Sequence, residues 1–126
     1  MANLASLQGI LQKFVTTSAS IQGAAVVTPD GLPLASLLPG AMDEEKTAAM
    51  SAAMLSLGER IGKELARGNI DRIFVQGETG YGVLTSCGED AMLLTLASED
   101  AKQGMLFMEI KQMAAQVMAA MEPVMA

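Results

Sequence analysis

The residues that could support catalysis are few in this chain and poorly placed for it. The 126 residues include no histidine and one cysteine, Cys87. Without histidine, the usual base of serine and cysteine nucleophile systems and the commonest metal ligand are both missing. Cys87 has no basic residue beside it in the sequence, so we interpret it as a buried strand residue and not as a reactive thiol. The sequence therefore predicts no catalytic residue, no metal site and no cofactor.

Two other patterns suggest chemistry but fit a structural role better. Residues 77–82 read Gly-Glu-Thr-Gly-Tyr-Gly, which is similar to part of a phosphate-binding loop. However, no Gly-Lys-Ser/Thr follows and no helical pattern begins there, so we interpret the segment as a hairpin turn. The acidic groups at 43–45 and 99–100 each stand where a helix is expected to begin, and the helix dipole favours negative charge at that end.

The elements that must position any functional residue follow the order α-β-β-α-β-β-β-α. Helical spacing of apolar residues predicts helices over 3–17 and 43–67, and a third that opens at Ser98 and ends near Pro123. Short apolar runs bounded by turn residues predict strands over 23–28, 32–37, 70–76, 81–87 and 91–97. The last strand has almost no polar residues, so it requires cover on both faces. The sequence therefore predicts one α+β domain over residues 1–126, arranged as α/β/α layers.

The helix expected at 43–67 carries two apolar stripes at helical spacing. One consists of large residues, namely Met50, Met54, Leu57, Ile61 and Leu65. The other consists mostly of small residues, namely Ala48, Ser51, Ala52, Leu55, Gly58 and Gly62. Because small residues allow close approach, we expect this second stripe to meet a second copy of the chain, together with Ile73 and Val75 of strand 70–76. The alternative is that the small residues seat the helix tightly on its own sheet.

The composition also points to a protein interface. Apolar residues make up 51% of the chain and charged residues 17%, whereas about 25% charged residues is typical. An apolar excess in a small domain favours an oligomer or a partner surface, although an Ala-rich helical composition would also account for it. The net charge of −6 argues against nucleic acid or an anionic membrane as partner. No apolar run approaches the roughly 18 residues of a membrane span, and the single cysteine fits a reducing cytoplasm.

Four stretches give the chain a resemblance to one family. They are the segment 23–35 (GAAVVTPDGLPLA), the helical segment 57–61 (LGERI), the segment 70–82 (IDRIFVQGETGYG), and the last strand continuing into Gly104. In this order they resemble the roadblock family, which includes the roadblock-type dynein light chains. The resemblance implies a roadblock-like, profilin-like fold: a five-stranded antiparallel sheet with the second helix on one face and the first and third on the other.

The resemblance also implies a function through surfaces. Members typically form dimers through the second helix and third strand, and bacterial and archaeal members commonly regulate small Ras-like GTPases. We therefore expect a non-enzymatic, cytoplasmic homodimer whose GTPase contacts lie among Glu59, Arg60, Lys63 and Arg67. An arginine finger would have to come from Arg60, Arg67 or Arg72. The alternatives are a scaffold subunit that leaves GTP hydrolysis unchanged and, less favoured, a small-molecule sensor.

Overall fold

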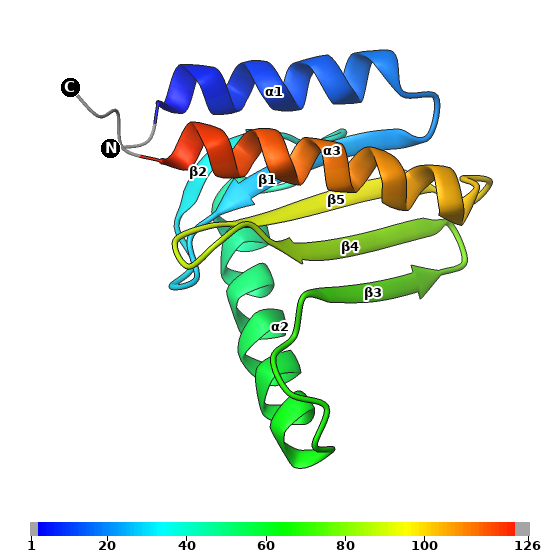
Figure 1. Ribbon diagram of the computed structural model, residues 1–126. Coiled ribbons are helices and arrows are strands. Elements are labelled where there is room, and N and C mark those ends of the chain that lie inside the picture. Colours follow the sequence, from blue (N-terminus) through cyan, green and yellow to red (C-terminus); the bar gives the residue numbers. More distant parts are fainter. Residues whose placement is uncertain (1–2, 123–126) are drawn as a thin grey trace.

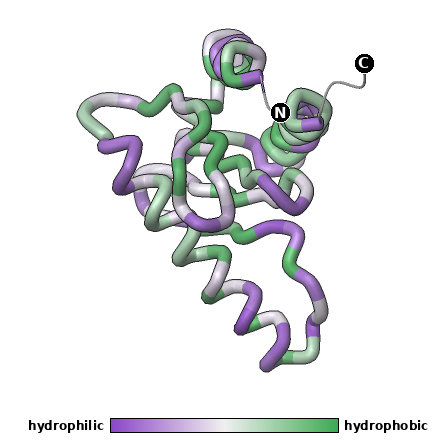
Figure 2. The backbone as a smooth tube through the Cα atoms, turned by 90° about the vertical axis from the view of Figure 1, so that its left-hand side faces the viewer, coloured by the Kyte–Doolittle hydropathy of each residue, from purple (hydrophilic) through white to green (hydrophobic). Residues whose placement is uncertain are grey.

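The computed structural model describes residues 3–122 and confirms the α/β/α layers (Figure 1). Its elements are α1 (Leu4–Thr17), β1 (Ile21–Val27), β2 (Pro33–Leu37), α2 (Glu44–Glu64), β3 (Arg72–Gly77), β4 (Gly80–Ser86), β5 (Met92–Ser98) and α3 (Gln103–Met121). The five strands form one antiparallel sheet in the order β2-β1-β5-β4-β3. Helices α1 and α3 lie side by side on one face, and α2 lies on the other (Figures 1 and 2).

The first two helices begin where their capping residues predict. The side-chain oxygen of Asn3 accepts a hydrogen bond from the Ser6 amide at 3.1 Å, and that of Asp43 accepts one from the Lys46 amide at 3.0 Å. Each bond satisfies one of the amides that the first helical turn leaves without a partner. Helix α2 ends at Glu64, three residues before the predicted end.

The start of α3 differs from the prediction. Ser98 is the last residue of β5, where its amide donates to the carbonyl of Ser20. Its hydroxyl bonds to the carboxylate of Asp100 at 2.6 Å, so the two polar residues stabilise a turn and not a helix start. The helix begins at Gln103 instead, and Lys102 at its N-cap makes no side-chain capping bond. The predicted end at Pro123 lies outside the described residues.

Two apolar cores lie on opposite faces of the sheet and meet at β5. Leu93 belongs to the core beneath α1 and α3, which also contains Leu7, Leu11 and Val117. Leu94, the next residue, belongs to the core beneath α2. Both side chains are at least nine-tenths buried, as are those of Met92, Thr95 and Ala97 in the same strand. Burial on both faces explains why the sequence of this strand shows no polar alternation.

The two edge strands of the sheet, β2 and β3, differ in whether a side chain bonds their outer backbone groups. At β2, the Gln8 side chain of α1 donates to the Ser36 carbonyl at 2.8 Å and accepts from the Ser36 amide at 3.3 Å. The Gln8 side-chain amide thus bonds the backbone groups that a neighbouring strand would otherwise use. Pro33, also in β2, has no amide hydrogen to donate. Within residues 3–122, no comparable bond covers the outer edge of β3, so β3 is the edge open to pairing.

Close packing leaves no room for a larger residue at two glycine positions of α2. A methyl group on Gly58 would lie 2.5 Å from the Ile73 Cδ1 atom, and one on Gly62 would lie 2.7 Å from the Ile70 Cδ1 atom and 2.8 Å from the Gly68 carbonyl oxygen. The C-terminal half of α2 extends beyond the sheet (Figures 1 and 2), and the returning segment packs against it at these glycines. Gly9 of α1 differs, because an added methyl group there would meet nothing within 4 Å.

Cys87 follows β4 and lies in the core beneath α1 and α3, only 3% exposed. Burial raises the pKa of its thiol from 9.0 to about 12. The thiolate, which is the reactive form of cysteine, is therefore scarce at neutral pH in the folded protein. This placement agrees with the interpretation of Cys87 as a structural residue.

The two helical glycines give a matched stability prediction. We expect Gly62→Ala to lower the free energy of unfolding by about 1–3 kcal/mol, because the backbone carbonyl of Gly68 must move. We expect Gly9→Ala to raise it by up to about 1 kcal/mol, because alanine favours the helix and meets no neighbour. Urea denaturation of both variants measures this difference. Equal effects of the two substitutions would contradict the packing described for α2.

The buried thiol predicts how stability changes with pH. Above the ordinary pKa of 9.0, the unfolded chain loses the Cys87 proton while the folded chain retains it. The free energy of unfolding should then fall by about 1.4 kcal/mol per pH unit between about 9 and about 12, relative to the Cys87→Ala variant. Below pH 9 the two proteins should keep a constant difference. Urea titrations at several pH values test this, and parallel curves up to pH 11 would contradict it.

Candidate protein interaction surface

The small-residue stripe of α2 faces the chain's own sheet. Ala48 and Ser51 are 0% and 1% exposed, and Gly62 is also buried. The Ser51 hydroxyl donates to the Thr47 carbonyl at 2.9 Å, so its polar group is satisfied within the helix. These three residues pack against their own chain, and their contact with a second copy stays a prediction. The close contacts at Gly58 and Gly62 favour the alternative, in which small residues let the helix lie close to its own chain.

The remaining residues of the expected interface differ in how exposed they are. Ala52, Leu55, Gly58 and Ile73 are half-buried, and the Leu55 and Ile73 side chains pack against the core beneath α2. Val75 is exposed on β3, next to the open edge. The role of these residues in a dimer stays a prediction, and Val75 is the one most accessible to a partner.

The large-residue stripe of α2 is the part that faces solvent. Four of its members are exposed, namely Met50, Leu57, Ile61 and Leu65. Leu57 is 59% exposed and Leu65 is 60% exposed. Leu65 is the C-cap residue of α2, and both side chains line a shallow hollow together with Ile61. Spacing alone finds this stripe in the sequence, but it does not tell which of two stripes faces inward.

The charged residues expected as partner contacts lie beside the apolar stripe, and Arg60 borders the hollow that Leu57, Ile61 and Leu65 line. Glu59, Arg60 and Lys63 are exposed and line a hollow of about 340 Å³. Arg67 is also exposed, and its Nε atom donates to the Leu65 carbonyl at 2.9 Å at the C-terminal end of the helix. The exposed part of α2 therefore combines an apolar stripe with a charged one, an arrangement common at protein interfaces.

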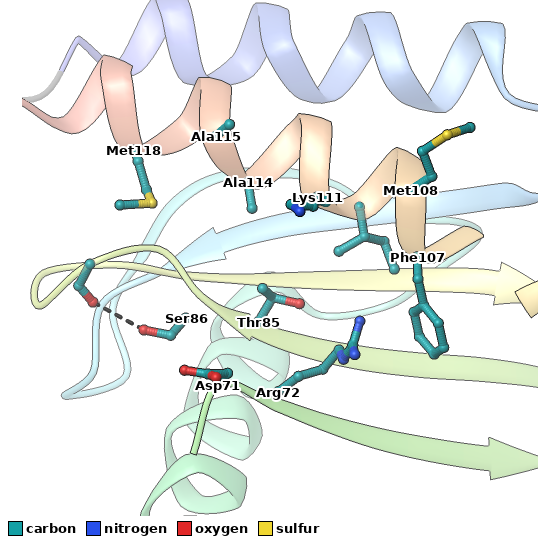
Figure 3. A pocket seen from close by; sticks show the side chains of 12 residues that line it. Asp71, Arg72, Thr85, Ser86, Phe107, Met108, Lys111, Ala114, Ala115 and Met118 are labelled. Atoms are coloured by element: carbon teal, nitrogen blue, oxygen red, sulfur yellow. Dashed lines mark hydrogen bonds between the residues drawn. The ribbon is translucent and has the colours of Figure 1, made fainter. Parts of the chain in front are cut away.

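The three candidate arginines do not gather at one place. Arg60 and Arg67 belong to α2 and its C-terminal turn. Arg72 lies at the start of β3, and its guanidinium carbon stands 4.2 Å from the centre of the Phe107 ring of α3. It therefore reaches toward the opposite face of the sheet (Figure 3). The geometry does not group Arg72 with the α2 surface.

The described residues offer little to other kinds of site. Among residues 3–122, no three acidic or cysteine side chains come together as they would around a metal ion. In the same range, no helix has both the length and the apolar character needed to cross a bilayer.

Comparison with known sequences finds one matching family model and several related proteins. Residues 7–97 match the family model of the Roadblock/LC7 domain. Two proteins of Methanocaldococcus jannaschii, MJ1340 and MJ0310, are each 32% identical over 99 residues, which cover 79% of this chain and 86% of each relative.

Comparison with solved structures agrees on the fold. The chain is similar to MglB of Myxococcus xanthus, with a TM-score of 0.84, 12% identity, and coverage of 98% of this chain and 96% of that one. It is also similar to a Roadblock/LC7 domain of Streptomyces avermitilis, with a TM-score of 0.80, 19% identity, and coverage of 87% and 92%. Profilin IB of Acanthamoeba castellanii follows at 0.67, with 14% identity and coverage of 90% and 97%. The match over residues 7–97 shows that the chain belongs to the Roadblock/LC7 domain family.

Proposed function

We propose that this protein is a homodimer without catalytic residues of its own, which binds a small Ras-like GTPase and modulates its GTP hydrolysis. Membership of the Roadblock/LC7 family supports a regulator of this kind, and the fold shared with MglB agrees with it. The single observation that carries the proposal is the exposed surface of α2, where apolar and charged stripes run along a helix that extends beyond its sheet.

The dimer would form through the open edge of β3 and the large-residue stripe of α2. Antiparallel pairing of two β3 strands satisfies their outer backbone groups and brings the exposed Val75 side chains together. The same operation places both α2 helices on one face of the joined sheets. Leu57, Ile61 and Leu65 are then positioned to be buried between copies, which gives a reason for their exposure in one chain.

The GTPase would contact the charged side of the paired α2 helices. Glu59, Arg60, Lys63 and Arg67 are exposed in the single chain, and Arg60 borders the apolar stripe. The mechanism that this surface supports is positional. By holding a switch loop of the GTPase, the dimer would bring residues of the GTPase itself to the γ-phosphate.

One observation favours the second candidate function, a scaffold that leaves hydrolysis unchanged. Arg72 stacks on Phe107 on the face opposite α2, which leaves only Arg60 and Arg67 to supply an arginine finger from this surface. Single-turnover hydrolysis by the bound GTPase separates the two functions. An altered rate supports the regulator, whereas binding with an unchanged rate supports the scaffold.

The proposed dimer predicts the effect of a charge in the apolar stripe. Ile61→Glu should convert the dimer to monomer, because a carboxylate buried between two helices would have no partner. The fold should persist, because Ile61 is 47% exposed in the single chain. Light scattering at micromolar concentration measures the mass, and urea denaturation checks the fold. Leu4→Glu is the matched control, since Leu4 is an exposed apolar residue of α1. A parent protein that is monomeric, or a dimeric Ile61→Glu variant, would contradict this interface.

The proposed GTPase surface predicts the effect of reversed charges. Arg60→Glu combined with Lys63→Glu should weaken binding of a Ras-like GTPase from the same genome, loaded with a non-hydrolysable GTP analogue. The loss should be largest at low salt, because exposed charges mainly alter association and are screened by ions. Lys13→Glu combined with Lys102→Glu changes the net charge equally on other elements and should bind like the parent. If both double variants bind equally well, the GTPase contacts a different surface.

A further inference from the structure

The helices above the sheet leave part of one face uncovered. Helix α1 packs on β1 and β2, and α3 packs on β5 and on α1. Among the described elements, α3 reaches β3 chiefly through one side chain, Phe107, whose ring centre lies 5.5 Å from that of Phe74, and a strip of β3 and β4 beside this contact has no helix packed on it.

A groove of about 720 Å³ occupies this uncovered strip, between α3 and the β3–β4 hairpin (Figure 3). We call it the α3–β4 groove. Its α3 wall is mostly apolar and includes Phe107, Met108, Ala115 and Met118. On the sheet side it is lined by Thr85 and Ser86 of β4 and by Asp71 and Arg72. Met108 is 54% exposed and Met118 is 45% exposed, so large apolar side chains border the groove without being covered.

The dimensions of the groove fit a helix. Phe107 and Met118 are eleven positions apart on α3, which corresponds to roughly 16 Å or three helical turns. An added helix beside α3 would complete the layer at ordinary packing distance and cover β3 and β4. Methionine side chains adapt to different apolar surfaces, which suits a docked helix. A single acyl chain would leave much of so open a groove in contact with water.

The charges at the groove indicate the character of this helix. Arg72 reaches up from β3, and Lys111 lies on α3 on the other side of the groove (Figure 3). The Arg72 guanidinium is held over the Phe107 ring, and Asp71 is the one acidic residue among those that line the groove. The two cations favour a partner that carries acidic side chains beside its apolar stripe.

We propose that the α3–β4 groove binds an amphipathic helix of a partner protein, with about three turns of apolar residues and acidic residues on their flank. This surface lies on the face of the sheet opposite α2. The inference therefore does not depend on the proposed GTPase contact, and the two partners would not compete for the same residues.

A phage-displayed library of random peptides of about 16 residues tests the proposal, with the folded protein as the target. We expect enriched peptides to carry apolar residues at i, i+3 or i+4, and i+7, with aspartate or glutamate on the flank. Their binding to isotope-labelled protein should shift the NMR signals of Thr85, Ala115 and Met118. Sodium dodecanoate serves as the probe for an acyl-chain site.

Two substitutions on α3 locate the binding. Ala115→Trp fills the groove from an exposed position and should lower the affinity of the enriched peptides by about tenfold or more. Gln112→Trp is the matched control, since Gln112 is exposed on the same helix outside the groove. Lys111→Glu should weaken acidic peptides, most strongly at low salt. The proposal is overturned if the library yields no helical pattern, or if the two tryptophan variants bind the enriched peptides equally well. It is also overturned if dodecanoate shifts the NMR signals of the groove residues and no peptide does.

Discussion

The burial of β5 on both of its faces is the constraint on which the rest of this structure depends. Leu93 and Leu94 point to opposite cores, so one strand needs helices both above and below. Because β5 also pairs with β1 and β4, it stands at the centre of the sheet and determines which strands become edges. The layers, the two edges and the position of α2 all follow from giving this strand cover on every side.

Most of the fold could be predicted from the sequence because local signals agreed with the global arrangement. Asn3 and Asp43 cap their helices through bonds that act within one turn, and the turns at 77–80 depend on neighbouring residues. The start of α3 could not be predicted in this way. Ser98 has the chemistry of a cap, but its amide pairs with Ser20, so a long-range strand contact decides its conformation.

The surface of α2 was harder to predict than its existence. Two stripes of apolar residues were visible, but spacing does not say which one faces the sheet. The deciding information lies in Ile70 and Ile73, whose side chains occupy the space that Gly62 and Gly58 leave empty. The small residues thus match bulky residues of the same chain, which exposes the larger Leu57 and Ile61. The α3–β4 groove was equally hidden, because it depends on how far two helices reach across the sheet.

The Gln8 side chain has a consequence for how many copies of this chain can join. With its amide bonded to Ser36, the β2 edge offers no free backbone at that point, while the β3 edge remains available. A subunit with two open edges can add neighbours indefinitely and grow into a fibre. A subunit with one open edge has a valence of one, so pairing by strand addition closes on itself after two copies. A single glutamine on α1 would thus limit the stoichiometry of the dimer proposed to form through β3.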